Sequence, residues 1–351
     1  MLNIAICSGG TGGHMFPACA LFELLKLRGH SVSMITDTRG DRFCNAINEG
    51  DKVVVKTVRF NIRNIFSIIF DLIGISRKFL SIWKNNRPDI IVGFGSLFTI
   101  VPIMIGKLFG SKIIVYEQNS ILGRANKFLS YFANFKVSTF TIDEKWQQLP
   151  SPVRKEFVKA KNSEYKCDDR IKIVVIGGSQ GAVSFSFIIP NALSLISSEL
   201  RKDIDIVQQV SSAKIDDLRK AYDKIDINAR LLDFVRNVAE EMSSAQLIIS
   251  RSGASTLAEL STLGRPAILI PYPLASDNHQ YHNAVCYKNR KAAWIVEENE
   301  NIERELSSII INLLNNRQLL KDAASNMING LGDKSTEIFA DFIEKSAAEQ
   351  R

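Results

Sequence analysis

The sequence has few of the residues that build disulfide or metal frameworks. Five cysteines and four histidines occur among 351 residues, and no cysteine pair has CxxC spacing. An odd, unpatterned set of cysteines favours reduced thiols in the cytosol and argues against a disulfide scaffold or a zinc site. We therefore expect no metal site.

Export and membrane-spanning signals are also weak. The N-terminus, MLNIAICSGG, has no basic segment and reaches glycine at position 9, so we expect no signal peptide. The 17 residues from Ile90 to Gly106 are uncharged, but Gly93, Gly95 and Pro102 interrupt them. A buried strand, a tight turn and a buried helix fit this stretch better than a spanning helix.

Positive charge is concentrated in the first half of the chain. Up to Arg154 there are 19 basic and 10 acidic residues, whereas 25 and 27 follow from Lys155 onward. A basic half indicates an anionic partner, which is nucleic acid, phospholipid or a phosphorylated substrate. RNA-binding motifs are absent and the basic residues interleave with a long apolar segment, so we expect no nucleic-acid partner.

Short β-branched runs alternate with helical stretches in both halves, which is typical of doubly wound parallel sheets. Helices are predicted from about His14 to Leu27 and over Phe185–Leu200. The predicted strands are Leu2–Cys7, Ser31–Thr36, Lys52–Val58, Ile90–Val92, Lys112–Tyr116, Ile171–Ile176, Ile204–Val210, Ala229–Leu232, Gln246–Ile249 and Ala267–Ile270.

This pattern predicts an α/β protein made of two Rossmann-like domains that face each other across a cleft. The length suits two domains, and we expect them at residues 1–154 and 155–332. Proline disfavours a continuing helix near Leu149–Val153, so the join is expected there. The helical tail at 333–351 is compatible with packing on either domain, including back on the first.

Two glycine loops follow the first strand of each half, in ICSGGTGGH from Ile6 and VIGGSQGA from Val175. Such a turn lets backbone N–H groups and a helix dipole approach an anion. Neither loop is a P-loop motif. Neither loop cleanly gives GxGxxG followed about 20 residues later by an acid on the second strand, although Asp37 could pass as that acid, so support for a nicotinamide enzyme is weak. The alternative is that such a loop is only a tight turn that binds no ligand.

Two more polar loops follow strands in the second half. SRSGASTLAEL, from Ser250, opens a helix with small residues, and Glu259 within it is suited to accept hydrogen bonds from ribose hydroxyls. PYPLASDNHQYHNA, from Pro271, gathers Asp277, Gln280 and Asn283, whose groups suit sugar hydroxyls. Ordinary helix capping and a solvated loop are the competing interpretations.

These motifs together resemble a known family. GGTGGH, EQN, GGSQGA, RSGA…E and QYHNA occur in the order and spacing of the MurG family of N-acetylglucosaminyltransferases. The resemblance implies a GT-B fold, a UDP-GlcNAc donor bound by the C-terminal domain, and a lipid I acceptor taken by the N-terminal domain. It implies inverting transfer of GlcNAc to the C4 hydroxyl of MurNAc, giving lipid II for peptidoglycan, by a peripheral enzyme on the cytoplasmic face of the inner membrane.

The family's substrate-binding positions carry over to residues of this sequence. Those expected near the acceptor and the reacting sugar are Thr11, Gly12, Gly13 and Asn119. Those expected on the donor side are Arg154, Ser179, Val235, Arg251, Ala254, Ser255, Thr256, Leu257, Ala258, Glu259, Gln280 and Asn283.

The sequence departs from the family pattern at three places, mostly on the acceptor side. Tyr116 replaces the histidine that commonly precedes Glu-Gln-Asn. Ser96 and Leu97 follow Gly95 where the family has Gly-Tyr. Ser151 stands in Pro150–Arg154, where the family has Gly-Asn-Pro-Val-Arg.

Inverting transfer needs a base for the acceptor hydroxyl and stabilisation of the departing UDP. His14, at a loop–helix junction, is the first candidate base, with a hydrogen bond to its own loop as the structural alternative. Glu117 is the second candidate. Arg154 and Arg251 are candidate cations for the leaving group. The scheme needs no metal or other cofactor, and we expect the Asp203-Ile204-Asp205 triplet to be incidental.

The segment from Arg59 to Arg87 combines a broad apolar helix sector with six basic residues and one acid. Phe66 and Phe70 are predicted to lie beside Arg77 and Lys84, which suits an anionic bilayer surface. The alternative is a core helix with a solvated rim.

Other functions use the same fold and donor. The main alternatives are a lipid glycosyltransferase with another acceptor and a non-hydrolysing UDP-GlcNAc 2-epimerase. An epimerase would need no lipid-facing basic rim.

Overall fold

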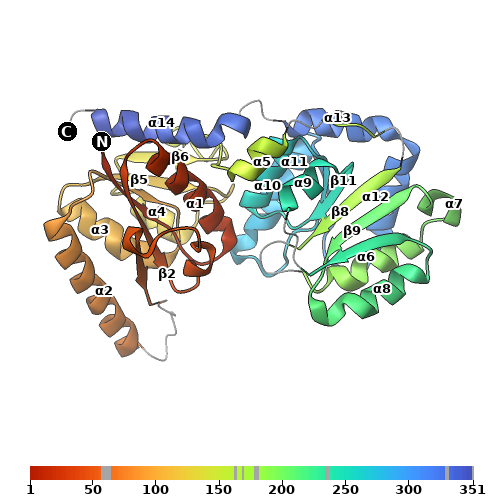
Figure 1. Cartoon of the computed structure of the whole chain (residues 1–351), viewed down its shortest axis with the longest axis horizontal. Helices are drawn as coiled ribbons and strands as arrows, with labels where there is room; N and C mark the ends of the chain where they lie inside the picture. Colours follow the sequence, from red (N-terminus) through yellow and green to blue (C-terminus); the bar gives the residue numbers. More distant parts are fainter. Residues whose placement is uncertain are drawn as a thin grey trace. The chain divides into compact units, whose positions relative to one another are not determined.

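The computed structural model describes residues 1–56, 65–161, 164–167, 170–177, 182–233, 237–328 and 332–349, with the backbone alone for 65–70. The chain divides into two compact units, drawn in Figure 1. Unit 1 comprises Met1–Arg154 and Lys334–Arg351, and unit 2 comprises Lys155–Asp333.

Over its described residues, unit 1 contains a seven-stranded sheet in the order β3-β2-β1-β4-β5-β6-β7, and the strand pairs are parallel. The strands are β1 (Asn3–Cys7), β2 (Ser31–Asp37), β3 (Lys52–Val55), β4 (Ile90–Gly93), β5 (Lys112–Glu117), β6 (Phe135–Ser138) and β7 (Gln147–Gln148). The α-helices are α1 (Gly12–Leu27), α2 (Ile65–Asn85), α3 (Ile100–Leu108), α4 (Arg124–Leu129) and α14 (Ser335–Ala348). The 3₁₀ turns are η1 (Asp41–Phe43), η2 (Glu49–Asp51), η4 (Leu97–Thr99) and η7 (Gly332–Lys334), which spans the boundary between the units.

The central strands of unit 1 are buried on both faces, which explains their continuous apolar sequences. Successive side chains of β1 point to opposite faces. Ile4 and Ile6 join the core cluster that includes α1 and α14. Ala5 and Cys7 join the cluster that includes α2, α3 and α4. Both faces of this sheet are therefore covered by helices.

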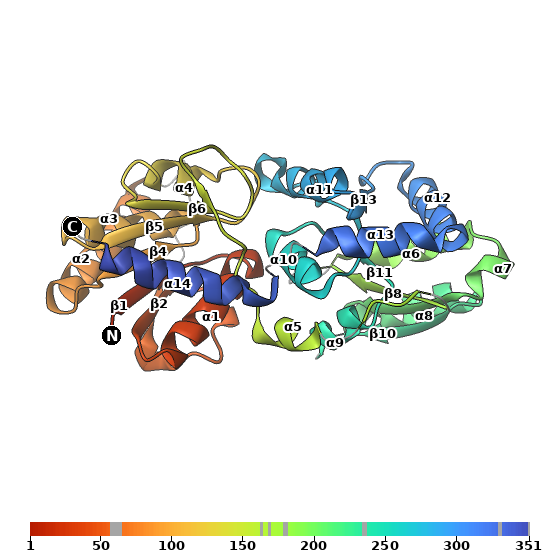
Figure 2. The same cartoon turned by 90° about the horizontal axis from the view of Figure 1, so that it is seen from above.

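The last helix, α14, returns to unit 1 and packs along α1 (Figures 1 and 2). Its Phe339 is fully buried and lies edge-on to Tyr116, with ring centroids 5.0 Å apart, and near Phe94 at 6.2 Å. Phe94 and Tyr116 also meet edge to face at 5.0 Å. Aromatic contacts therefore join the chain's C-terminal segment to two central strands.

Ion pairs complete the attachment of α14. Arg28, just after α1, contacts Asp341 at 2.6 Å and Glu344 at 3.1 Å, and His30 contacts Glu344 at 2.8 Å. Partial burial raises the pKa of Glu344, but hydrogen bonds from His30 and Arg28 outweigh it and place that pKa below its ordinary value. This contribution to stability is present at neutral pH and is lost as pH falls through the lowered pKa.

Unit 2 repeats the plan with a six-stranded parallel sheet, counted over its described residues, in the order β10-β9-β8-β11-β12-β13. The strands are β8 (Ile171–Ile176), β9 (Ile204–Gln209), β10 (Asn228–Leu232), β11 (Leu247–Ser250), β12 (Ala267–Leu269) and β13 (Ala293–Ile295). The helices are α5 (Lys155–Ala160), α6 (Phe185–Ser194), α7 (Ser198–Arg201), α8 (Ile215–Asp223), α9 (Val238–Ser243), α10 (Ala254–Leu263), α11 (His279–Asn289), α12 (Ile302–Asn315) and α13 (Arg317–Met327), with 3₁₀ turns η5 (Ser212–Lys214) and η6 (Ser276–Asn278).

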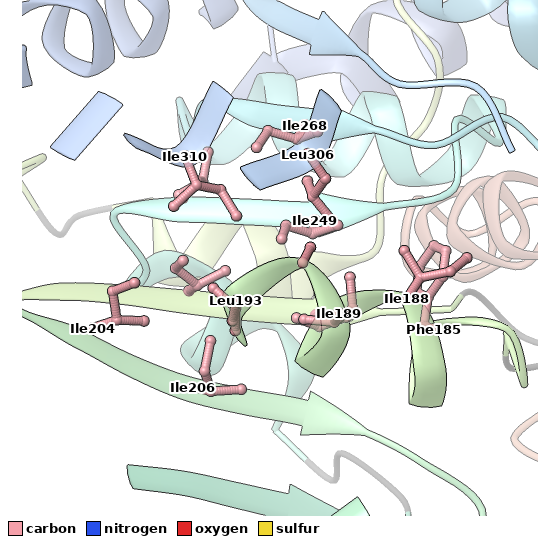
Figure 3. Packing of buried hydrophobic residues seen from close by; sticks show 14 of the residues in the cluster. Phe185, Ile188, Ile189, Leu193, Ile204, Ile206, Ile249, Ile268, Leu306 and Ile310 are labelled. Carbon is pink, nitrogen blue, oxygen red and sulfur yellow. The ribbon is translucent and has the colours of Figure 1, made fainter. Parts of the chain in front are cut away.

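The core of unit 2 forms where two helices cover one face of this sheet (Figure 3). Ile189 and Leu193 project from α6, and Leu306 and Ile310 project from α12, toward Ile249 of β11. These side chains belong to one buried apolar cluster, which fixes the sheet and positions the loops at its carboxyl edge.

Two parallel sheets with flanking helices confirm the predicted fold class, but several elements differ from the expectation. The predicted helix at 185–200 is two helices, because Leu195 and Ile196 bond to carbonyls three residues back and Ser197 is extended. Strands β6, β7 and β13 were not expected. Strand β3 ends at Val55, and residues 57–58 of the predicted strand lie outside the described residues.

The aromatic contact between α14 and the sheet yields a stability prediction. Phe339→Ala should lower the free energy of unfolding by about 3–5 kcal/mol, because it removes a buried ring and leaves a cavity. The exposed Lys345→Ala on the same helix is the control, expected within about 0.5 kcal/mol of wild type. Scanning calorimetry measures both. Equal effects of the two variants would show that α14 is not part of the core of unit 1.

Candidate active site

The glycine loop of unit 1, between β1 and α1, is hydrogen-bonded to a buried carboxylate. Asp37 Oδ1 accepts hydrogen bonds from the backbone N–H of Gly10, at 3.0 Å, and of Gly40, at 2.9 Å. Gly10 has φ +88°, a conformation that favours glycine. This oxygen of Asp37 is used to shape the loop, so the geometry does not favour Asp37 as the ribose acid of a nicotinamide enzyme.

Thr11, Gly12 and Gly13 form the entry to α1. Thr11 is the extended residue before the helix, and its carbonyl accepts hydrogen bonds from the backbone N–H groups of His14 and Met15. Thr11 is exposed and Gly13 is half-buried, whereas Gly12 is buried. An exposed helix entry of this kind offers backbone N–H groups to an anion.

The imidazole of His14 contacts two other loops at the carboxyl edge of the sheet. Its Nδ1 lies 2.7 Å from the carbonyl oxygen of Phe94, after β4, and 2.6 Å from the side-chain nitrogen of Gln118, after β5. Gly95 lies so close that an added Cβ would sit 3.2 Å from the ring. The alternative in which the His14 ring bonds its own loop does not describe these two contacts.

Glu117, the second candidate base, is buried and accepts four hydrogen bonds from its own connection. Oε1 accepts from the backbone and side-chain amides of Asn119, at 3.0 and 3.1 Å. Oε2 accepts from the Gly123 N–H at 3.0 Å and from the Asn126 amide at 2.9 Å. Both oxygens thus fold residues 117–126 into a fixed loop that places Asn119, and the geometry favours His14 over Glu117 as the base.

Arg154 ends the first segment of unit 1. Its guanidinium lies over the ring of Phe16, 4.4 Å from the centroid, and Phe16 in turn meets Phe43 edge to face at 5.3 Å. Such cation–π contact places the charge beside the first helix, α1.

In unit 2, Arg251 joins several loops rather than projecting alone. Its guanidinium pairs with both carboxylate oxygens of Glu298, at 3.0 and 3.3 Å. It also donates to the carbonyls of Ile270 and Pro271 and to the hydroxyl of Ser184. These contacts favour a structural role at the carboxyl edge of the sheet over the expected role as a cation for the leaving group.

The two polar motifs of unit 2 are fastened to each other. The hydroxyl of Ser252 donates to the carbonyl of Gln280 at 2.8 Å, and the buried Asn283 amide donates to the Ser252 carbonyl at 3.3 Å. The side-chain oxygen of Gln280 accepts from the Tyr272 N–H at 3.0 Å. The sequence-predicted sugar loop and the small-residue loop therefore form one surface.

Helix α10 starts from this surface, and its N-cap residue, Gly253, has an extended backbone. Glu259 is buried in the helix, and the residues before it differ in exposure. Ala254 and Leu257 are buried, and Ser255, Thr256 and Ala258 are half-buried. Two predicted donor residues, Ser179 and Val235, lie outside the described residues.

The Asp-x-Asp triplet has ordinary surface partners. Asp203 pairs with Arg317 at 3.6 Å, and Asp205 pairs with Arg170 at 2.9 Å. Within the described part of the chain, no group of three or more His, Cys, Asp or Glu side chains is placed to hold a metal ion.

Two family models match the chain. The glycosyltransferase family 28 N-terminal domain matches residues 4–137, and the C-terminal domain of that family matches residues 172–345. Two curated relatives match nearly the whole chain. Both are named UDP-N-acetylglucosamine--N-acetylmuramyl-(pentapeptide) pyrophosphoryl-undecaprenol N-acetylglucosamine transferase. The one from Rickettsia felis is 36% identical over 93% of this chain and 95% of its own. The one from Rhizobium rhizogenes is 34% identical over 99% of this chain and 96% of its own.

The chain belongs to glycosyltransferase family 28. The predicted resemblance to MurG is thereby confirmed. A crystal structure of Acinetobacter baumannii MurG superposes with a TM-score of 0.81 at 24% identity, covering 98% of this chain and 99% of that one. A UDP-GlcNAc 2-epimerase from Neisseria meningitidis superposes at 0.67 with 12% identity, covering 98% and 100%. These structures show that the GT-B fold is shared.

Two departures from the family pattern have a clear structural meaning. Tyr116 points into the core, where its hydroxyl lies 2.6 Å from that of Thr139 and its ring meets Phe339. This substitution therefore changes packing. Ser96 adopts φ +82° directly after Gly95 at +91°, so a residue with a side chain occupies a left-handed position that favours glycine. Ser151, the third departure, is buried.

Helix α2 divides its described side chains between core and surface. Ile75, Phe79 and Trp83 are buried against the sheet, so this part of the predicted apolar face is core. Arg77 and Lys84 are exposed, and so are Ile73 (43%) and Leu80 (44%), at spacings that share one helix face. The side chains of Phe66 and Phe70 lie outside the described residues. Among the helices that the structure describes, none is long and apolar enough to cross a bilayer.

Sequence reasoning missed two residues of the site. Gln118 stands inside the quoted Glu-Gln-Asn motif, and that motif was the available signal. Glu298 lies in the acidic run after β13, where the sequence contains no sign of its pairing with Arg251 47 residues earlier.

The contacts of Arg251 predict that this residue stabilises the unliganded protein. Arg251→Lys should lower the free energy of unfolding by about 1–3 kcal/mol, because a lysine cannot pair bidentately with Glu298 and also bond two carbonyls. Arg304→Lys, on the exposed face of α12, is the matched control. Thermal unfolding without ligand measures both. An Arg251 variant as stable as the control would mean that this side chain serves a ligand instead.

Proposed function

We propose that this family 28 enzyme transfers GlcNAc from UDP-GlcNAc to the C4 hydroxyl of MurNAc in undecaprenyl-diphospho-MurNAc-pentapeptide, which converts lipid I to lipid II. The observation that carries this proposal is the pair of curated relatives, which share 34–36% of residues over nearly the full length and bear that activity in their names. The transfer inverts the anomeric carbon and serves peptidoglycan synthesis.

The donor is proposed to bind to unit 2 on the surface formed by residues 251–259 and 271–283. The joined loops of Ser252 and Gln280 present backbone and amide groups suited to a sugar and a diphosphate. Helix α10 begins there, and its N-terminal dipole stabilises the charge that develops on the departing UDP. Glu259, within the same helix, is the proposed acceptor for ribose hydroxyls.

The acceptor is proposed to bind to unit 1 at the entry of α1 and the loop of Asn119. The N–H groups after Thr11 suit the acceptor's diphosphate. His14 lies at the same helix entry and is the proposed base that takes the proton from the C4 hydroxyl as it attacks the anomeric carbon. Both groups belong to loops fixed by buried carboxylates, so the geometry exists before substrate binds.

Because lipid I is anchored in a bilayer, we propose that the enzyme binds the membrane peripherally on the cytoplasmic face of the inner membrane. The exposed face of α2 carries two apolar side chains, Ile73 and Leu80, which alternate along the helix with the cations Arg77 and Lys84. Apolar side chains bordered by cations suit an anionic lipid surface.

The epimerase alternative shares the fold, as the superposition at a TM-score of 0.67 shows. An identity of 12% supports the fold alone. The two functions are distinguished by product: an epimerase forms UDP-N-acetylmannosamine from UDP-GlcNAc without an acceptor, whereas the proposed transferase releases UDP only when the acceptor is present.

The first functional prediction concerns transfer and its base. Purified enzyme with radiolabelled UDP-GlcNAc and a lipid I analogue should form labelled disaccharide product. His14→Ala should lower kcat by about 10²–10⁴-fold, because the base is lost, while the Kd of UDP-GlcNAc stays nearly unchanged.

The control is His30→Ala, which removes a histidine that pairs with Glu344 on α14 and should lower stability without lowering kcat. No product from the wild type would contradict the proposed function. A kcat for His14→Ala within a few-fold of wild type would remove His14 as the base.

The second functional prediction concerns the membrane. Arg77→Ala combined with Lys84→Ala should weaken binding to anionic vesicles by roughly tenfold or more, since each cation near the surface contributes on the order of 1 kcal/mol. Added salt should weaken wild-type binding in the same assay because it screens exposed charges. Activity on a short-chain acceptor should persist.

The matched control replaces Arg219 and Lys220, which are exposed on α8 of unit 2, by alanine. Vesicle sedimentation measures all three proteins. Equal binding of the three to anionic vesicles would mean that the exposed face of α2 is an ordinary solvated rim.

A further inference from the structure

We propose that Gln118 is a positioning residue that holds His14 with its proton on Nδ1 and its lone pair on Nε2. The assignment of the tautomer follows from contacts within unit 1. Its consequence for catalysis rests on the proposed function, in which His14 is the base.

Two polar atoms compete for the same ring nitrogen. The carbonyl oxygen of Phe94 lies 2.7 Å from His14 Nδ1, and the side-chain nitrogen of Gln118 lies 2.6 Å from it. A neutral imidazole nitrogen is either a donor or an acceptor. A bare Nδ1 would accept a hydrogen bond from the Gln118 amide N–H but would face the lone pairs of the Phe94 carbonyl. A protonated Nδ1 would donate to the Phe94 carbonyl but would face the N–H groups of the Gln118 amide.

Only the amide of Gln118 can resolve this conflict by turning. The Phe94 carbonyl is always an acceptor, and residue 94 is tied to β1 because its N–H donates to the Cys7 carbonyl at 2.9 Å. A half-turn of the Gln118 amide exchanges its oxygen and nitrogen at almost no steric cost. With the oxygen toward the ring, the Nδ1–H donates to both carbonyl oxygens, and both short contacts become attractive.

The surroundings of the amide support this orientation. Gln118 is 3% exposed, and its Oε1 has no hydrogen-bond partner among the described residues. A buried amide oxygen without a donor is costly. Turned toward His14, the same oxygen gains a donor.

The arrangement also suits a ring that takes up a proton. When Nε2 accepts the proton of the acceptor hydroxyl, the imidazolium keeps two carbonyl oxygens at Nδ1, and hydrogen bonds to a charged donor are shorter and stronger than neutral ones. Gly95 closes the pocket from one side, where a Cβ would press on the ring.

The direct test is the ¹⁵N NMR spectrum of protein labelled at histidine, at a pH near 9, well above the ordinary imidazole pKa of about 6.5. The four histidines are few enough for His14 to be assigned by its loss in His14→Gln. We expect the Nδ1 signal of His14 to be that of a protonated nitrogen and Nε2 that of a bare one. A bare Nδ1 in the wild type would overturn the proposal, and this test needs no variant of Gln118.

Two substitutions separate positioning from a structural role. Gln118→Glu keeps an oxygen at the ring, so the Nδ1–H tautomer should remain. If the amide nitrogen instead donated to a bare Nδ1, this variant would reverse the tautomer. Gln118→Ala removes one of the two acceptors and leaves the Phe94 carbonyl, so Nδ1 should stay protonated, its signal should shift as one hydrogen bond is lost, and kcat should fall about tenfold or more because the ring is less firmly positioned. The KM for UDP-GlcNAc should stay within about twofold.

The control is Gln148→Ala, which removes an exposed glutamine of unit 1 that donates to the Thr139 carbonyl. It should change neither the His14 signals nor kcat. A Gln118→Ala protein with the wild-type Nδ1 chemical shift and the wild-type kcat would overturn the proposal. Failure of the wild type to transfer GlcNAc would contradict the proposed function alone, because the tautomer is measured without substrate.

Discussion

The loops of this enzyme depend on charged side chains buried at the carboxyl edge of each parallel sheet. A charge inside a protein is costly unless hydrogen bonds satisfy it. In unit 1, Asp37 and Glu117 are satisfied by N–H groups of the loops above them. In unit 2, Arg251 is satisfied by Glu298 and by two loop carbonyls. The cost of burial thus forces the loops into one conformation.

This constraint connects the fold to the proposed chemistry. Both sheets have the central order in which the first strand lies beside the second and the fourth, so the loops that follow these strands meet at one edge. In unit 1 that edge brings together the entry of α1, the Phe94 carbonyl and the Gln118 amide around His14. Substrate then meets groups that are already placed, which lowers the reorganisation required during transfer.

The sequence predicted the glycine loop of unit 1 and the two sheets, because β-branched runs and glycine positions are local signals. It did not predict which polar residues face inward. Glu117 matched a base by residue type, yet four donors from its own loop surround it. Tyr116 suggested a changed acceptor site, but packing by Phe339, more than 200 residues later, turns it into the core. Such long-range contacts leave no periodic signal.

The central claim is that buried charges hold these loops before any substrate binds. Hydrogen exchange of the unliganded protein, resolved at single amides by NMR, tests it most directly. The N–H groups of Gly10, Gly40, Asn119 and Gly123 should be protected nearly as well as those of the central strands, because each donates to a buried carboxylate. Exchange of these amides at the rate of an open loop, with protection only after substrate is added, would contradict it.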